Sequence, residues 1–589
     1  MRHNLITILL TLLLTSGTGW TAAAGAGEEA MTAGVDFRSF TPRRTIQAST
    51  LEELMVAVAD AQAGDLIEVA DGDYNNAEVI LIEKKEGTAQ APIILRATNR
   101  GKARIIGQGG FQLIRCAYVV IEGFSFFHKD VNLACRIHHS HHCRFTRNHI
   151  RIQEQAPTEQ NNRRIHWAGI SGDNSHHNRI DHNLFEEKRN SGVMIFTGGS
   201  SLETGHMSTQ YDRIDHNHFR NFYPAKVNGY ETIRIGSSTY SHSSANTIVE
   251  HNLFEHCDGE AEIISVKTKE NTIRHNTFQN CRGMLTLRNS HGCLIEGNYF
   301  LNDGSQKRSE GIRFYGSGHI ITNNYFQNLG GSAILVKTGD IERRTDPKWK
   351  YQERDGNLNN WGSYQRPEDV LIAFNTIINC SVAFRLGETG TRAKTYPLPA
   401  RNITIANNLI ISNREKINSD LGLWKNFTFE GNIFYSTHSN SELGWVLPSD
   451  GYRLVDPRLV KRNELLQLTP QSPVIDAAKG NYPKVNRDIH GHLRDGQKDI
   501  GAEELSSSPA LHTPLTPSDV GPNTVIAVLK AKGNSLTGDF DGDGSVGFQD
   551  FLLFAQAFGS ADSEFDLDGD NSVGFRDFLI FAQVFVTSL

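Results

Sequence analysis

The sequence predicts an all-β fold, a parallel β-helix in which short strands wind into stacked coils. The first observation is a repeated phrase in which an asparagine is followed two residues later by Ile or Phe, as in Asn183-Leu-Phe. The second is the spacing, because several of these asparagines follow one another at nearly equal, short intervals. A β-rich phrase recurring in this way is typical of a solenoid whose coils bury one face on their neighbours. The ten asparagines are Asn148, Asn183, Asn217, Asn252, Asn276, Asn298, Asn324, Asn375, Asn408 and Asn432.

The residue types around this phrase suit a coil of a β-helix. Ile, Val and Phe at alternate positions supply side chains that point inward from short strands. An asparagine at a fixed turn can bond to the backbone of the next coil, so the same residue is needed each time. The larger gaps between the asparagines predict loop insertions. We therefore expect one stacked column of asparagines along the solenoid.

Length, charge and cysteine content narrow the class of protein. At 589 residues the chain exceeds one ordinary globular core, which agrees with a repeat architecture. The net charge of −7 argues against general nucleic-acid binding, so an acidic ligand would need a local basic patch. Seven widely spread cysteines are a poor disulfide framework. We expect buried free thiols, with a Cys257–Cys281 bridge between adjacent coils as the alternative.

The N-terminus has the features of a secretory signal. Arg2 and His3 precede an apolar run from Leu5 to Leu14, and Ala22 to Ala24 offer a small-residue cleavage site. The run is too short to span a bilayer, and no later stretch is apolar enough. We predict a signal peptide at residues 1–24 and a secreted, periplasmic or cell-surface protein without a membrane span.

The predicted β-helix domain, residues 25–505, begins with a helix. Thr50-Leu-Glu-Glu53 is a capping box, and Leu51, Leu54 and Val58 follow at helical spacing before Gly64. A solenoid needs its ends covered, since an open end exposes unpaired strand edges. We therefore expect this amphipathic helix to cover the N-terminal end.

The C-terminal part of the chain predicts a linker and a second domain. Residues 506–535 are rich in Ser, Pro and Thr, as linkers are. Residues 536–589 hold a duplicated segment, and acidic side chains at loop positions 1, 3, 5 and 12 of each copy describe two Ca²⁺ loops of the EF-hand type. The expected ligands are Asp539, Asp541, Asp543 and Asp550 in the first loop and Asp566, Asp568, Asp570 and Asp577 in the second.

Each loop leads into an apolar helix, and the pair resembles a dockerin domain in spacing and duplication. The resemblance implies either a protein partner of the cohesin type or a Ca²⁺-stabilised attachment module.

A histidine-rich stretch from Cys135 to Cys143 looks like a zinc cluster. However, Ser140-His-His recurs as Ser175-His-His and again as Ser290-His-Gly, each at the same distance before one of the ten repeated asparagines. The histidines therefore occupy a repeated turn, and this pattern favours a structural role over a metal site.

The charged residues between 226 and 313 do not recur with the period of the asparagine repeat, which indicates a candidate functional site. Glu260 and Glu262 alternate along one strand and so share one of its faces. Arg288 follows Lys267 at an interval close to one coil, so the two should be neighbours on adjacent coils. Paired carboxylates repel unless a cation binds them, and Ca²⁺ suits an exported protein. Asn228 could add an amide oxygen from the preceding coil.

These residue types suit β-elimination from a uronic acid. A Ca²⁺ ion can neutralise the substrate carboxylate and make the neighbouring C5 proton acidic. A lysine beside an arginine and a metal has a lowered pKa, which makes it usable as a base. Arg288 could stabilise the enolate or assist the leaving oxygen, and Arg234, Lys269 and Arg313 would line a basic cleft. The alternative is a surface network of salt bridges without catalysis.

Three motifs resemble polysaccharide lyase family 6, which contains chondroitinase B and many alginate lyases. They are Asn228-Gly-Tyr-Glu-Thr-Ile-Arg-Ile-Gly, Gly259-Glu-Ala-Glu-Ile-Ile-Ser-Val-Lys267 and Leu285-Thr-Leu-Arg288, and the resemblance spans about residues 45 to 440. It implies a right-handed parallel β-helix in which Asn228, Glu260 and Glu262 bind Ca²⁺, Lys267 is the base and Arg288 the acid. Arg313 and Tyr315 match a substrate-contacting strand. The family usually has His-Gly after this arginine, whereas this chain has Asn289-Ser290, which bears on substrate specificity.

The sequence thus predicts an exported lyase that cleaves an anionic, uronate-containing polysaccharide, with alginate the favoured substrate. Chondroitin or dermatan sulfate is the alternative substrate, and a non-catalytic polysaccharide-binding β-helix is the alternative function. Insertions near residues 340 to 365 and 385 to 400 are expected to form walls of the substrate subsites.

Overall fold

The computed structural model describes most of the chain from Phe40 onward. The described residues are 40–154, 164–199, 207–224, 228–241, 243–340, 364–445, 448, 450–494, 496–524, 538, 540, 546–558, 565, 567, 573–574, 577–578, 581–582 and 585. The chain divides into two compact units, of which Pro42–Val525 is the larger, and the described residues from 538 onward belong to the smaller. The predicted signal peptide lies outside the described residues.

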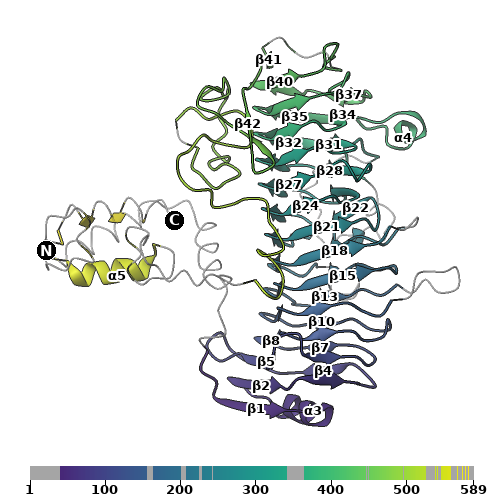
Figure 1. Ribbon diagram of the computed structural model, residues 1–589, viewed down its shortest axis with the longest axis vertical. Coiled ribbons are helices and arrows are strands. Elements are labelled where there is room, and N and C mark those ends of the chain that lie inside the picture. The colour runs from purple at the N-terminus through teal and green to yellow at the C-terminus, as the bar shows by residue number, and fades with distance from the viewer. Residues whose placement is uncertain are drawn as a thin grey trace, which may run out of the picture. The chain divides into compact units, whose positions relative to one another are not determined.

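The larger unit is a parallel β-helix built from three long sheets. Each coil contributes one strand to each sheet in turn, so strands of one sheet pair with their counterparts in the coils before and after (Figure 1). Every pairing in the three sheets is parallel among the described residues. This confirms the predicted all-β solenoid.

The first sheet, sheet A, has fifteen described strands: β1 Arg44–Ala48, β2 Asp65–Val69, β5 Ile93–Ala97, β8 Val119–Glu122, β11 Arg144–Thr146, β14 Arg179–Asp181, β17 Arg213–Asp215, β20 Ile248–Glu250, β23 Thr272–Arg274, β26 Leu294–Glu296, β29 Ile320–Thr322, β32 Glu368–Ala373, β35 Ala400–Ala406, β38 Trp424–Lys425 and β39 Thr428–Glu430.

Sheet B has fourteen described strands: β3 Gly72–Tyr74, β6 Ala103–Ile105, β9 Ser125–Phe126, β12 His149–Ile150, β15 Leu184–Lys188, β18 His218–Phe222, β21 Leu253–Cys257, β24 Thr277–Gln279, β27 Tyr299–Leu301, β30 Tyr325–Gln327, β33 Thr376–Ile378, β36 Leu409–Ser412, β40 Asn432–Ser436 and β41 Tyr452–Leu454.

Sheet C has twelve described strands: β4 Ile80–Glu83, β7 Phe111–Ile114, β10 Cys135–His138, β13 Ala168–Ser171, β16 Ile195–Thr197, β19 Ile233–Ile235, β22 Glu262–Val266, β25 Gly283–Leu287, β28 Ser309–Phe314, β31 Ser332–Val336, β34 Val382–Leu386 and β37 Ser419–Asp420. A separate antiparallel pair joins β42 Val460–Arg462 to β43 Leu465–Gln467.

The predicted asparagine column is present between sheets A and B. All ten side chains are buried, and from Asn183 onward each side-chain oxygen accepts the backbone N–H of the asparagine one coil earlier. At Asn276, for example, the oxygen lies 3.0 Å from the backbone nitrogen of Asn252 and 3.0 Å from its amide nitrogen. The phenylalanine two residues further along stacks inside the coil, and Phe278 lies 4.5 Å from Phe300 between ring centroids.

Helices are few among the described residues: α3 Leu51–Asp60, a short 3₁₀ turn η2 Ser238–Tyr240, α4 Gly390–Thr395 and α5 Phe548–Ala557. α3 begins where the capping box predicts it, since the Thr50 side chain accepts the backbone N–H of Glu53 at 3.1 Å. Its buried residues pack toward the first strands, and the helix contacts β1, β2 and β4. That α3 closes the end of the solenoid stays a prediction. No helix among the described residues has the length and apolar character to cross a membrane.

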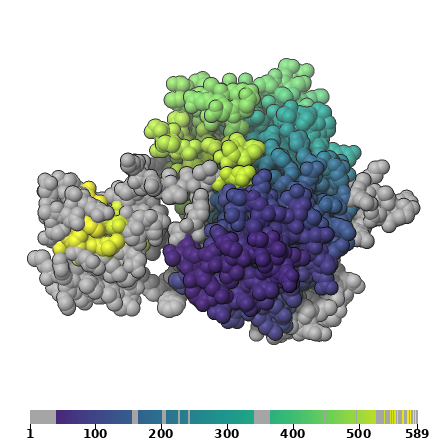
Figure 2. All heavy atoms as spheres, turned by 60° about the horizontal axis from the view of Figure 1, so that its bottom comes forward, coloured from purple at the N-terminus to yellow at the C-terminus, as the bar shows by residue number. Residues whose placement is uncertain are grey.

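The chain after β41 returns along the side of the β-helix instead of leaving it. Leu465, Ile489 and Ala502 pack against apolar side chains of sheet B, including Tyr299 and Tyr325. The yellow-green segment lies against this side in Figure 1, and part of it is visible on the surface in Figure 2.

The segment from 506 to 524, expected to be the first part of a linker, also belongs to the larger unit. Arg147 donates to the carbonyls of Pro522 and Thr524, and the His512 ring stacks on His275 at 3.8 Å. The backbone N–H of Leu515 bonds to Thr277 Oγ1. A Ser- and Pro-rich composition does not predict backbone contacts of this kind. We call residues 506–524 the strap.

The smaller unit has its own apolar core, in which Phe551, Phe554 and Phe581 are buried. Asp550 accepts backbone N–H groups from Phe540 and Gly547, and Asp577 accepts the corresponding pair in the second copy, from Leu567 and Gly574. The two loops are therefore closed in the same way. The other six predicted loop ligands (Asp539, Asp541, Asp543, Asp566, Asp568 and Asp570) lie outside the described residues.

All seven cysteines are buried free thiols. The backbone N–H of Cys257 lies 3.4 Å from the Cys281 sulfur, so the two are neighbours on adjacent coils without a bridge. The histidine-rich stretch forms the predicted repeated turn, because His141 and His176 pair across adjacent coils and His142 and His177 share a positive φ.

Candidate functional site

The candidate site lies at the end of three neighbouring strands of sheet C. Val266, Leu287 and Phe314 pair across β22, β25 and β28. The next residue in each coil is Lys267, Arg288 and Tyr315, and backbone hydrogen bonds of 2.8 to 2.9 Å hold all three to the preceding coil. The one-coil interval between Lys267 and Arg288 therefore places their backbones side by side, as the sequence predicts.

Three carboxylates meet beside this column. Glu231, Glu260 and Glu262 are all buried, and one oxygen of each lies within 4.8 Å of one oxygen of each of the others. The strand pairing shifts after Glu262, which lets the chain bend at this point. Gly283 allows the close approach, because a side chain there would meet the carbonyl oxygens of Glu260 and Ala261 at 2.7 and 2.8 Å.

The cluster has unused bonding capacity on the side chains that face one another. Glu231 Oε2, Glu260 Oε1 and Glu262 Oε2 are buried and have no hydrogen-bond partner among the described residues. Burial raises the pKa of Glu260 to about 7, and the carboxylates of Glu231 and Glu262 add to the effect. Buried acceptors without donors are costly unless a cation neutralises them, and hard oxygen ligands suit Ca²⁺. The donor set therefore fits a Ca²⁺ ion, with the exposed Asn228 at the mouth of the same cleft.

Lys267 is almost fully buried next to this cluster. Its Nζ lies 3.5 Å from Glu231 Oε1. Burial lowers the pKa of Lys267 below its ordinary value and the nearby Arg288 lowers it further, while the Glu231 carboxylate opposes the shift. A lowered pKa makes a lysine easier to use as a base.

Two arginines frame Glu262 from the following coils. Arg313 forms an ion pair with Glu262 Oε1, and Arg288 Nη1 lies 3.8 Å from Glu262 Oε2. Arg288 also donates from Nε to the Tyr364 hydroxyl at 3.1 Å. The guanidinium of Arg288 is therefore held between a carboxylate and a phenol.

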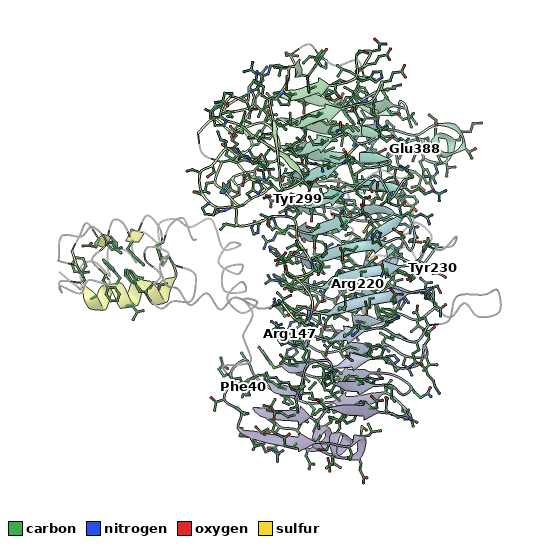
Figure 3. All side chains as sticks on the ribbon, viewed as in Figure 1. Phe40, Arg147, Arg220, Tyr230, Tyr299 and Glu388 are labelled. Carbon is green, nitrogen blue, oxygen red and sulfur yellow. The ribbon has the colours of Figure 1, made fainter. Side chains whose placement is uncertain are left out.

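A cleft of about 330 Å³ lies beside this cluster; Glu260, Glu262 and Arg288 line it, whereas Glu231 and Lys267 do not. Its walls are Asn228, Glu260, Ala261, Glu262, Arg288, Arg313, Tyr315, Tyr364, Thr391, Arg392, Thr395 and Tyr396. The insertion predicted near 385 to 400 thus forms a wall of the cleft through α4 and Tyr396, while residues 341–363 lie outside the described part of the chain. Tyr230, beside Glu231, and Glu388 lie on the same side of the β-helix, away from Arg147 and the strap (Figure 3).

Two predicted substrate contacts lie outside the cleft walls. Arg234 occupies β19 one coil earlier and lies over the Phe196 ring, with its Cζ 6.0 Å from the ring centroid. Lys269 is half-buried in the turn after β22, where its backbone bonds to Ser243. Asn289, which follows Arg288, is buried and accepts from the Ser238 hydroxyl at 3.4 Å.

Sequence reasoning missed Glu231 and Tyr364. Glu231 lies inside the motif that begins at Asn228, and its signal was a charged residue between positions that otherwise continue the apolar pattern. Tyr364 lies far along the chain from Arg288, at the end of an insertion, and nothing in the spacing connects the two.

The comparison with known families decides the relationship. The family model described as chondroitinase B matches residues 48–441, and that range contains the whole candidate site. The chain belongs to the chondroitinase B family. Solved structures of similar fold include polysaccharide lyases. No curated protein matches the sequence of this chain.

Several solved structures share the fold. A mutant of the PL6 family alginate lyase AlyGC is 25% identical, with a TM-score of 0.62 over 82% of this chain and 59% of that one. A mannuronic acid specific polysaccharide family 6 lyase from human gut microbiota is 28% identical, with a TM-score of 0.58 over 70% of this chain and 91% of that one. The family 6 polysaccharide lyase Pedsa3628 from Pseudopedobacter saltans, 24% identical with a TM-score of 0.54 over 66% and 92%, is a likeness of fold. The chain spans about three fifths of AlyGC.

Proposed function

We propose that the protein is a polysaccharide lyase that cleaves a uronate-containing chain by Ca²⁺-assisted β-elimination. The observation that carries the proposal is the meeting of three buried carboxylates, each with an oxygen that accepts no hydrogen bond among the described residues, beside a buried lysine and an arginine. Membership of the chondroitinase B family supports it. A glycoside hydrolase would need two carboxylates that flank the scissile bond, whereas these three lie together.

Glu231, Glu260 and Glu262 would hold a Ca²⁺ ion, with Asn228 as a further oxygen ligand at the cleft mouth. The bound ion would neutralise the carboxylate of the substrate and so make the C5 proton more acidic. The residues of the chain then carry the proton transfers.

Lys267, in its neutral form, takes the proton from C5 of the uronate. The C4–O bond breaks, the electron pair forms a double bond between C4 and C5, and the departing oxygen leaves protonated. Arg288 stabilises that oxygen and takes the role of acid, while Tyr364 holds the guanidinium in place through Nε. Arg313 and Tyr315 would bind the neighbouring sugar units.

Alginate is the substrate that we propose, because the structural relatives at or above 25% identity are an alginate lyase and a mannuronic acid specific enzyme. The family model itself is described as chondroitinase B, so chondroitin or dermatan sulfate is the second candidate. From the predicted signal peptide we further propose that the enzyme is exported. From the dockerin-like loops we propose that it is attached through its smaller unit, either to a partner of the cohesin type or by a Ca²⁺-stabilised contact.

Product analysis in water labelled with heavy oxygen tests the reaction type. β-Elimination makes one new end unsaturated and incorporates no label, whereas hydrolysis adds one labelled oxygen per cleavage. Unlabelled products from alginate in the presence of Ca²⁺ are expected. Labelled products would replace the elimination with hydrolysis, and intact substrate with retained binding would indicate a polysaccharide-binding protein.

A further inference from the structure

Four histidines form a two-by-two array in one turn of two adjacent coils, between sheets C and A. His141 stacks on His176 and His142 on His177, with ring centroids 4.9 Å apart in both pairs. Within each coil the two Nδ1 atoms are hydrogen-bonded to each other, at 2.9 Å for His141 and His142 and at 2.7 Å for His176 and His177. The array thus gathers four ring nitrogens in one small region.

The turn itself does not require histidine. The coil before has Tyr118 in line with His142 and the coil after has Tyr211 in line with His177, and their rings continue the stack at 4.6 and 5.0 Å. All four residues share a φ between 51° and 55°. In the other column the neighbouring coils have Ala117 and Gln210. Other residue types therefore fit this turn, so turn geometry alone does not account for the histidine pairs.

Three of the histidines have the geometry of a ligand set. His142, His176 and His177 each offer a ring nitrogen within 4.8 Å of one on each of the other two. The three rings are half-buried, so an ion can reach them from solvent.

We propose that His142, His176 and His177 bind one divalent transition-metal ion of the kind that prefers imidazole, such as Zn²⁺, and that the ion joins the two coils. Zn²⁺ and Cu²⁺ prefer imidazole, and three histidines with one open position are a common Zn²⁺ set. This site takes a different cation from the carboxylate cluster, which has only oxygen ligands.

The site is separate from the candidate active site. The same turn continues from His176 through Gln210 and Ser244 to Lys269, three coils further along. Three coils correspond to roughly 14 Å along the solenoid axis. The proposal is therefore independent of the proposed elimination reaction.

A second group, His182, Asp215 and His216, has similar spacing, and its carboxylate is held in ion pairs. His216 Nδ1 bonds to Asp215 at 2.8 Å, and Arg179 pairs with the same carboxylate at 2.6 Å. These ion pairs leave the carboxylate little capacity for a metal, and the group supplies a matched control.

The test is calorimetric titration of Zn²⁺ into the full-length protein, without an affinity tag and with Ca²⁺ saturating. We expect one Zn²⁺ per chain. The double variant His142→Tyr/His177→Tyr, which takes the residues of the flanking coils, should weaken binding by at least about tenfold. His216→Asn, which takes the residue of the corresponding turn position at Asn323, should bind as the natural protein does.

Thermal melting gives a second readout, because a ligand that binds only the folded state raises the melting temperature. Zn²⁺ should raise it for the natural protein and not for the double variant. If the double variant does not fold, His176→Gln, which copies Gln210, makes the same comparison. Absence of Zn²⁺ binding by the natural protein, unchanged affinity in the variants of the array, or loss of binding in His216→Asn would each overturn the proposal.

Discussion

The proposed role of Lys267 depends on its position at the end of a strand of sheet C. It follows the last residue of β22, is almost fully buried, and lies 3.5 Å from Glu231. The same position on the next coil is Arg288, so the coil spacing alone makes the two residues neighbours.

Replacing Lys267 with Ala should abolish turnover and leave the polysaccharide bound. A general base contributes about 10² to 10⁴ in rate, so we expect kcat to fall by about 10³. The measurement is the initial rate of unsaturated-uronate formation together with a binding titration. Lys425→Ala, an exposed lysine at the end of β38, is the matched control. A Lys267→Ala enzyme that keeps more than about a tenth of the rate would remove Lys267 from the base role.

Tyr364 is expected to affect the reaction by positioning Arg288. Tyr364→Phe removes the oxygen that accepts the Arg288 Nε–H at 3.1 Å but keeps the ring that stacks on Tyr315. We expect kcat to fall by about tenfold with little change in KM, since an interaction that orients Arg288 matters most in the transition state. Tyr223→Phe, which loses a surface bond to Glu187, should behave as the natural enzyme. A rise in KM at constant kcat would instead make Tyr364 a simple binding residue.

At the scale of the element, the asparagine column carries much of the coil-to-coil bonding. Asn276→Ala leaves the buried backbone N–H of Asn252 without its acceptor and takes one acceptor from the Asn252 side-chain amide. An unsatisfied buried donor costs about 1–3 kcal/mol, so we expect a loss of about 2 kcal/mol in the free energy of unfolding. Urea denaturation measures it, with the exposed Asn440→Ala as the control. Equal stability of the two variants would show that the column contributes no net stability.

The strap should loosen when the pH falls. Burial lowers the pKa of His251 to about 3 and that of His275 to about 2, and burial also lowers the pKa of His512. The folded state therefore excludes protons that the unfolded state takes up below about pH 6.5, so stability is present above that pH and lost on acidification toward 3. Glu250, Asp215 and Asp488 favour the charged rings, while Arg274, His216 and His490 oppose them.

Limited proteolysis within residues 506–524 at about pH 8 and about pH 5 measures this effect. Cleavage should be faster at the lower pH, and the difference should shrink in His512→Phe, which keeps a stacking ring without a titratable group. Equal protection of the strap at both values would contradict the role of the histidine stack.

The sequence predicts what repeats and what lies in one local motif. The period of the asparagines predicts the coils, and the one-coil interval predicts that Lys267 and Arg288 are neighbours. It does not predict the contact of Tyr364 with Arg288, because an insertion separates the two and its path is not periodic. The strap escapes prediction for a related reason: its contacts are made by backbone groups and by His512, within a segment whose composition is that of a linker.

For the whole molecule, two kinds of sequence pattern correspond to two structural units. The solenoid turns a linear repeat into a long surface on which residues far apart in sequence, such as Asn228 and Tyr396, share one cleft. The smaller unit builds a separate core from a duplicated segment. With its expected Ca²⁺ loops and the proposed Ca²⁺ site in the cleft, the protein is expected to respond to a chelator in both units.

The most direct test of the central claim follows absorbance in the unsaturated-uronate band with purified protein and alginate, then with chondroitin and dermatan sulfates, in Ca²⁺ and in chelator. The account predicts a rise with alginate that depends on Ca²⁺ and is absent in Lys267→Ala. A rise with the sulfated chains alone would change the substrate and keep the reaction. No rise with any uronate from a folded, Ca²⁺-loaded sample would contradict the proposed elimination.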